Sequence, residues 1–197
     1  MIAINTVAIG DKSCIKVNQS EAMRYLGVKE MDDATGSLYT QGAKEMYDVA
    51  EPRAIYIKVP IDVQNDTVDF GFMKVNSRKL AKNLIDCNEA YVFCATLGMG
   101  VDRHFERLNK ISSAKAMVFS AVGSSLVEGL CDYVNEMLSQ NKETKPRFSC
   151  GYGDFCLEHQ ADILKALDAN KRLGIFLTDS YMMVPVKTVT AIIGIRR

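Results

Sequence analysis

The feature that most restricts the fold of this chain is a long helical pattern over residues 114–138. Apolar residues recur there at helical spacing, and Ser112 or Ser113 can cap the first turn. Small residues gather in the first half of the pattern, at Ala114, Ala116, Ala121, Gly123, Ser124 and Ser125. Because small side chains let other groups approach a helix backbone closely, we expect a sheet or a ligand to pack against this segment.

The other predicted elements are a mixture of helices and strands. Shorter helices are predicted over residues 21–26, 36–50, 78–85, 101–109 and 157–167. Strands are predicted over residues 53–59, 67–75, 90–96, 176–178 and 186–195. The turn-like residues 64–66 between the first two strands indicate an antiparallel hairpin. This order of elements favours an α+β fold with a mainly antiparallel twisted sheet and flanking helices.

The length of 197 residues suits one domain, and no repeat or long linker divides the chain. We predict a single domain over residues 1–197, with a mainly helical part over 1–50 and a mixed part over 51–197. The 24 basic residues balance the 24 acidic ones, which argues against nucleic acid as a partner. The N-terminal residues do not resemble a signal peptide, and we predict no membrane span. We therefore expect a cytoplasmic protein without a membrane partner.

Cysteine and histidine give little sign of a metal or catalytic centre. The six cysteines form no C-x-x-C pair, and the chain has only two histidines to join them. Each cysteine is interpreted as a small buried side chain, with a redox-sensitive bridge between Cys150 and Cys156 as an alternative. His104 fits the exposed side of an amphipathic helix, and His159 fits a surface or packing position. The sequence therefore predicts no catalytic residue and no metal site.

The most unusual segment is the loop at residues 147–159, where two glycines flank a tyrosine shortly before a helix. Arg147 can hold a carboxylate through two parallel hydrogen bonds. Gly151 and Gly153 permit positive φ angles and a close approach of the backbone, and Tyr152 offers a flat ring with a hydroxyl. This combination indicates a ligand loop, while the alternative is a simple turn that leads into the helix.

Two carboxylates on the long helix form a second candidate group. Glu128 and Asp132 lie four residues apart and therefore on one face of the helix. They would repel each other unless a positive group lies between them. They could hold the ammonium or the hydroxyls of a ligand, or they could simply face solvent.

Motifs in the last third of the chain are similar to those of a known family. They are Arg147-x-x-x-Gly151-Tyr152, the pair Glu158-His159, and Leu-Thr-Asp-Ser-Tyr-Met-Met-Val-Pro-Val-Lys-Thr-Val over residues 177–189. In this order and spacing they resemble the activation domain of cobalamin-dependent methionine synthase over residues 147–194. Residues 121–132 resemble the long helix of that domain, and the first hundred residues look more like its short stand-alone relatives.

The resemblance implies a ligand and its contacts. The activation domain binds S-adenosylmethionine and helps to restore methylcobalamin after the cobalamin of the synthase has been oxidised to cob(II)alamin. On this resemblance Arg147 would hold the methionine carboxylate, and Glu128 would be the helix glutamate of the site. Gly151 and Tyr152 would contribute a backbone and a ring. The implied cofactor is S-adenosylmethionine, with cobalamin supplied only through a partner.

The function implied by the resemblance is that of an S-adenosylmethionine-binding accessory protein. It would support reductive remethylation of the cobalamin of a methionine synthase or related corrinoid methyltransferase, with a flavodoxin-like electron donor. The chain would be a component of that enzyme more than an independent catalyst. The alternative is a non-catalytic scaffold or assembly subunit that has lost ligand binding. A free-standing enzyme that uses His159 or a cysteine has little support.

Overall fold

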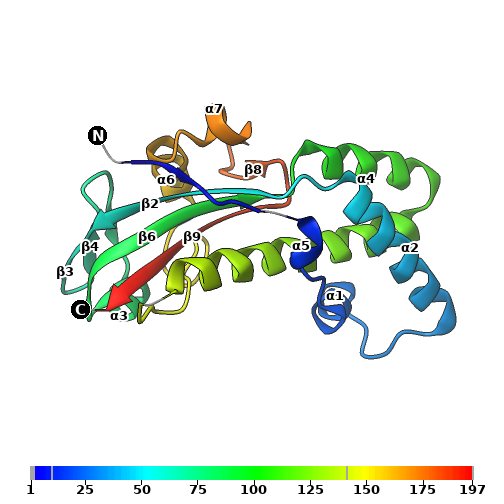
Figure 1. Cartoon of the computed structure of the whole chain (residues 1–197), viewed down its shortest axis with the longest axis horizontal. Helices are drawn as coiled ribbons and strands as arrows, with labels where there is room; N and C mark the ends of the chain where they lie inside the picture. Colours follow the sequence, from blue (N-terminus) through cyan, green and yellow to red (C-terminus); the bar gives the residue numbers. More distant parts are fainter. Residues whose placement is uncertain (1–2, 10, 141, 197) are drawn as a thin grey trace.

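The computed structural model describes residues 3–9, 11–140 and 142–196. Its centre is an antiparallel sheet with the strand order β1-β2-β6-β9. The strands are β1 (Asn5–Thr6), β2 (Arg53–Pro60), β6 (Cys87–Thr96) and β9 (Thr188–Arg196). Ile57 lies opposite Val92, and Val92 lies opposite Ile192. Figure 1 shows the three long strands as one twisted layer.

Helices cover both faces of this sheet (Figure 1). On one face lies α5 (Ser113–Ser139), against which α1 (Gln19–Leu26), α2 (Asp33–Val49) and α4 (Met99–Ile111) pack. On the other face lie α3 (Arg78–Leu84), α6 (Gln160–Ala166) and α7 (Ala169–Leu173). Because strand residues alternate between faces, Phe93 packs on the α5 side and Val92 on the α3 side. The predicted α+β class with a mainly antiparallel sheet is confirmed.

Strand pairing differs from the predicted hairpin. β2 pairs with β1 and β6, and not with residues 67–75. Residues 62–76 instead form a small separate sheet of β3 (Asp62–Gln64), β4 (Thr67–Asp69) and β5 (Lys74–Asn76). The predicted turn exists, with Asn65 at a φ of 54°, but it joins β3 to β4. Near the end of the chain, β7 (Phe176–Leu177) pairs with β8 (Met183–Val184).

Local capping signals set the helix boundaries. The side chains of Asn18, Ser77 and Ser112 accept hydrogen bonds from N–H groups in the first turns of α1, α3 and α5. Asp32 caps α2, which therefore begins before the predicted residue 36. The predicted helix at 157–167 is a 3₁₀ turn, η2 (Leu157–His159), followed by α6. A further 3₁₀ turn, η1 (Lys12–Cys14), precedes α1.

The small residues of α5 allow the N-terminal part of the chain to pack against it. A Cβ atom on Gly129 would lie 2.4 Å from the carbonyl oxygen of Lys16. The Ser125 hydroxyl accepts a hydrogen bond of 2.8 Å from the N–H of Asn18 and donates one of 2.9 Å to its carbonyl. α5 is long and apolar enough to cross a membrane by length and composition, but most of this stretch is buried inside the molecule. It is the central core helix of this fold.

Some side chains have surroundings that differ from expectation. His104, predicted on an exposed helix side, is buried: its Nε2 lies 2.8 Å from Oε2 of Glu45, and its ring packs on Phe119. The amphipathic pattern of α4 was misleading because α2 and α5 cover that side of the helix. Cys14 and Cys156, predicted to be buried, are exposed because they lie in η1 and in a loop rather than in a core element.

Candidate functional site

Arg147 is positioned by the β9 edge of the main sheet. The segment 144–148 runs antiparallel to β9, with bridges from Thr144 to Ile195 and from Phe148 to Ile192. Phe148 and Ile192 exchange two backbone hydrogen bonds of 2.9 Å. Phe148 is buried in the core on the α3 side of the sheet, so the neighbouring Arg147 projects to the α5 side.

The guanidinium of Arg147 lies between the two carboxylates of α5. Its Nη2 donates a hydrogen bond of 2.6 Å to Oε2 of Glu128, and its Nη1 donates a short one to Oδ1 of Asp132. The side chains of Arg147 and Glu128 are 27% and 28% exposed, whereas that of Asp132 is 63% exposed. Burial opposes the charge, but the hydrogen bonds to Asp132 and Glu128 raise the pKa of Arg147 overall. Arg147 is therefore the positive group that this carboxylate pair requires.

The loop that follows Arg147 folds back on itself. Gly151 and Gly153 have φ angles of 85° and 67°, which favour glycine. The N–H of Gly151 donates a hydrogen bond of 2.7 Å to the carbonyl of Phe155, which closes the loop. Tyr152 is 67% exposed, and its ring meets that of Phe148 edge-on at 5.3 Å between centroids. The loop thus presents a tyrosine ring to solvent beside the segment that carries Arg147.

Asp154 anchors this loop to α3. Its carboxylate accepts a hydrogen bond of 2.5 Å from the Ser77 hydroxyl and bonds of 2.9 and 3.2 Å from the N–H groups of Arg78 and Lys79. The bond from Ser77 contributes most to lowering the pKa of Asp154. The carboxylate also lies at a helix N-terminus, where negative charge is favourable. Sequence inspection missed this anchor because its partners lie 75 to 77 residues earlier.

Of the four candidate ligand-binding residues, Arg147 and Glu128 are in direct contact. Asp132, noted in the sequence only as the second carboxylate of the helix, shares the same guanidinium. Gly151 and Tyr152 lie in the loop just beyond, and in the described part of the chain neither forms a hydrogen bond with Arg147. The site is thus an ion-pair cluster on α5 flanked by an exposed loop.

A free-standing enzyme would use His159 or a cysteine, and the structure shows the surroundings of these groups. His159 stacks on Phe155 at 5.6 Å between centroids, and its Nδ1 lies 3.6 Å from Oδ2 of Asp162. Burial raises the pKa of the Cys150 thiol to about 12, so Cys150 is not a thiolate at neutral pH. Cys150 and Cys156 are separate thiols in this structure and form no bridge.

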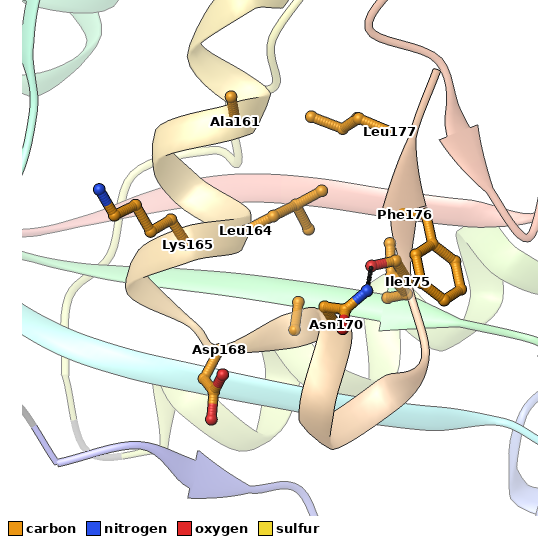
Figure 2. Close-up of a pocket in the computed structure, with 9 residues that line it drawn as sticks. Ala161, Leu164, Lys165, Asp168, Asn170, Ile175, Phe176 and Leu177 are labelled. Carbon is orange, nitrogen blue, oxygen red and sulfur yellow. Dashed lines mark hydrogen bonds between the residues drawn. The ribbon is translucent and has the colours of Figure 1, made fainter. Parts of the chain in front are cut away.

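A cavity of about 450 Å³ lies on the other face of the sheet, between α6, α7 and β7 (Figure 2). Leu164 and Ile175 form part of its wall, and Phe176, which also lines it, is 54% exposed. Asn170 donates a hydrogen bond of 3.4 Å to the carbonyl of Ile175, which ties α7 to the segment leading into β7 (Figure 2). Because Arg147 projects to the α5 side, this cavity is not part of the ion-pair cluster.

Comparisons with known proteins bear on the fold. No model of a known protein family matches the sequence, and no curated protein sequence matches it. The structure is similar to a solved crystal structure of the MetH reactivation domain bound to AdoHcy, with a TM-score of 0.74 and 14% sequence identity. The match covers 98% of this chain and 78% of that one. The likeness confirms the fold that the sequence motifs implied.

Proposed function

We propose that this protein binds S-adenosylmethionine and acts as a cytoplasmic accessory protein. It supports reductive remethylation of the cobalamin of a methionine synthase or a related corrinoid methyltransferase. The observation that carries the proposal is the guanidinium of Arg147 between Glu128 and Asp132, in a chain with the fold of a reactivation domain. The similar solved domain is bound to AdoHcy, which supports a ligand of this class.

The charges of the cluster suit the amino-acid end of S-adenosylmethionine. Arg147 can take the ligand carboxylate through two hydrogen bonds. Glu128 is largely buried and keeps a positive partner, because the ligand ammonium replaces the guanidinium there. Asp132 is largely exposed and can turn into solvent. Binding thus exchanges ion pairs and leaves no buried charge without a partner.

The reaction requires this chain to bind the methyl donor and to orient it. One electron from a flavodoxin-like donor and the methyl cation of S-adenosylmethionine convert the partner's cob(II)alamin to methylcobalamin and release S-adenosylhomocysteine. Arg147 and Glu128 bind the amino-acid end of the ligand. Gly151 contributes a backbone contact to the ligand, and Tyr152 contributes a ring contact. Their contribution is orientation of the methyl group toward the partner.

Calorimetric titration with S-adenosylmethionine tests the proposal. We expect Arg147→Ala to weaken binding by about 2 kcal/mol or more, the scale of a lost charged hydrogen bond. Arg147→Lys should also weaken binding, because lysine keeps the charge but not the fork of donors. The matched control is Arg172→Ala, which removes an arginine from an exposed ion pair with Asp168 on the other face of the sheet. That variant should bind as the wild type does.

The alternative function is a scaffold subunit of a corrinoid methyltransferase that has lost the ligand. One observation favours it: Glu128 and Asp132 already satisfy Arg147 without a ligand. No heat at millimolar S-adenosylmethionine, together with co-purification of a corrinoid protein, would support the scaffold and contradict ligand binding. If the ligand binds, the absorption spectrum of a cob(II)alamin-loaded synthase fragment without a reactivation domain reports remethylation when this protein is added together with S-adenosylmethionine and a reduced flavodoxin.

A further inference from the structure

A second cavity, of about 350 Å³, lies between α4, α5 and the segment that leads from β8 to β9. Its wall is mainly apolar, formed by Met99, Val101, Phe105, Phe119, Val184 and Val186. Four polar residues complete it: Asp102, Glu106, Ser120 and Lys187. An apolar cavity with a few convergent polar groups is the usual form of a small-molecule site, for which volumes of about 300–1,000 Å³ are typical.

Lys187 brings an ammonium to this cavity, and its hydrogen-bond partners there are two serine hydroxyls. Its Nζ donates hydrogen bonds of 3.1 Å to Oγ of Ser120 and 2.8 Å to Oγ of Ser124. Across the residues that the structure describes, no carboxylate forms an ion pair with this ammonium. Burial lowers the pKa of Lys187, and the charge of Asp102 opposes that shift. Since an ammonium has three N–H donors, one remains for an anion.

The position of Lys187 is fixed by its backbone and by its stem. Its carbonyl accepts a hydrogen bond of 3.0 Å from the N–H of Leu97, at the end of β6. A Cβ atom on Gly123 would lie 3.2 Å from Cε of Lys187, so the lysine stem runs over a bare stretch of α5. The ammonium is therefore held at the cavity before any ligand arrives, which lowers the entropy cost of binding.

Two carboxylates of α4 face the same cavity. Asp102 and Glu106 lie four residues apart, on one side of the helix. Oδ2 of Asp102 accepts a hydrogen bond of 2.9 Å from the N–H of Val186, which leaves Oδ1 for another donor. Burial raises the pKa of Asp102 and the charge of Glu106 adds to this effect, while the hydrogen bond from Val186 and the charge of Lys187 oppose it. Each of these groups would gain from a positive partner.

We propose that this cavity binds an apolar α-amino acid in its zwitterionic form. The ligand carboxylate meets Lys187, and the ligand ammonium meets Asp102 and Glu106. A plain carboxylate would face two negative groups and one positive group, and a plain amine would bring a second positive charge beside Lys187 and no anion for its third N–H donor. A zwitterion brings a carboxylate to Lys187 and an ammonium to the two acidic residues, and its side chain packs against the apolar wall.

This site is distinct from the Arg147 cluster, and the inference does not rest on the proposed function. Ser124 contacts Lys187, and Glu128, the nearest cluster residue on α5, lies four residues later, about 6 Å along the helix. The two sites also use different cations from different segments. A ligand at one can therefore be told from a ligand at the other by substitution.

Titration of the wild-type protein with L-leucine, L-methionine and L-phenylalanine at millimolar concentration is the first test. N-acetyl-L-leucine lacks the ammonium, and L-leucinamide lacks the carboxylate. We expect at least one free amino acid to bind, and the blocked forms of leucine to bind at least about tenfold more weakly than leucine. Absence of binding by all three amino acids, or equal binding of a blocked analogue, would overturn the proposal.

Two variants then test whether the amino acid binds in this cavity. Lys187→Met keeps an unbranched stem and removes the ammonium, and Asp102→Asn keeps an acceptor for the N–H of Val186. Each should lower amino-acid affinity at least about tenfold, while Lys165→Met at the other cavity should bind as the wild type does. Amino-acid binding that survives Lys187→Met and is lost in Arg147→Ala would place the ligand at the Arg147 cluster and contradict the proposal.

Discussion

Lys187 donates a hydrogen bond of 2.8 Å to Ser124, one helical turn before Glu128 on α5. Arg147 contacts the same helix at Glu128 and Asp132. Positions 120, 124, 128 and 132 recur every four residues, so they form one slowly turning polar stripe on a helix that is otherwise mostly buried. Two cations from different segments meet this stripe, one at each of its ends.

Gly123→Ala tests the packing of the lysine stem. The added Cβ would lie 2.8 Å from Cε of Met46 and 3.2 Å from Cε of Lys187. Both atoms are at or near the ends of flexible side chains that can shift, so we expect a net loss of stability of up to about 1 kcal/mol from overpacking. Amino-acid binding should weaken because Lys187 is displaced. Urea unfolding measures the first effect and calorimetry the second.

Gly36→Ala is the matched control for that substitution. Gly36 also lies inside a helix, but nothing would lie within 4 Å of its added Cβ. We expect this variant to gain about 0.5–1 kcal/mol, because alanine is the better helix former. A similar loss of stability in both variants would show that the effect at Gly123 is not one of close packing.

Lys187→Met is expected to keep or raise the melting temperature at neutral pH. Folding lowers the pKa of Lys187 through burial. Between the folded pKa and the ordinary lysine value, the folded state therefore binds fewer protons, and the stability from this group rises with pH. Methionine abolishes that alkaline rise and removes the cost of burying a charge. Melting curves at several alkaline pH values measure the effect, and a large loss of stability at pH 7 would show that Lys187 is a structural residue.

The sequence predicted the helices of this fold better than the strand pairing. Asn18, Ser77 and Ser112 act within a few residues, so their capping signals are visible in a local pattern. β2 looked like one arm of a hairpin because a turn follows it closely. Its partners are β1 and β6, and β6 begins only at Cys87, a distance at which no local signal indicates a partner.

Only some residues of the candidate sites could be predicted from local sequence patterns. Arg147 was identified because it lies in a glycine-containing loop. Glu128 and Asp132 were identified because they are charged residues on a helix that is otherwise mainly apolar. Lys187 was not, because it lies within the predicted strand at residues 186–195 and its serine partners are 67 and 63 residues away. His104 was misplaced for the same reason, since Glu45 comes from a helix 59 residues earlier.

Ser77→Ala should loosen the anchor of the Gly151–Tyr152 loop. Ser77 is buried, accepts a hydrogen bond of 3.1 Å from the N–H of Leu80 and donates one to Asp154. We expect the free energy of unfolding to fall by about 1–2 kcal/mol, the usual cost of a lost N-cap residue. Urea unfolding measures this loss, and hydrogen exchange should show faster exchange in residues 149–156. Unchanged exchange there would contradict the anchoring role.

Asp154→Asn probes the same anchor through pH. Hydrogen bonds in the folded state lower the pKa of Asp154. Its contribution to stability is therefore fully present above the ordinary carboxyl pKa and is lost as the pH falls through the folded value. The wild type should be the more stable protein at pH 7, and the difference should vanish in acid. Asp179→Asn in an exposed loop is the control, and an unchanged difference at low pH would contradict this account.

Thiol reactivity should follow exposure. Cys14 and Cys156 are exposed, Cys150 is half-buried, and Cys87, Cys94 and Cys131 are buried. We expect Ellman's reagent at pH 8 to react quickly with Cys14 and Cys156 and with the others only after unfolding. Cys156→Ser should remove half of the fast phase. Loss of only the Cys156 half of the fast phase after mild oxidation, with recovery in reductant, would instead support a bridge between Cys150 and Cys156.

Asp132→Asn should strengthen S-adenosylmethionine binding, and Glu128→Gln should weaken it. Both carboxylates form ion pairs with Arg147. When the ligand carboxylate binds the guanidinium, the more buried Glu128 still requires a positive partner, and the exposed Asp132 does not. Asp132 then acts as a competitor of the ligand. An exposed ion pair is worth about 0.2–1 kcal/mol, so its loss should raise affinity by a factor of about 1.4 to 5.

Titrations at several ionic strengths and with a double variant test whether Asp132 competes with the ligand for Arg147 or acts only through the net charge of the site. The gain from Asp132→Asn should shrink as ionic strength rises, because salt screens exposed pairs. It should also be absent in an Arg147→Ala background, where Asp132 has no guanidinium to occupy. If Asp132→Asn weakened binding as much as Glu128→Gln, Asp132 would be a group that holds the ligand, and the cluster would bind the ligand ammonium between both carboxylates.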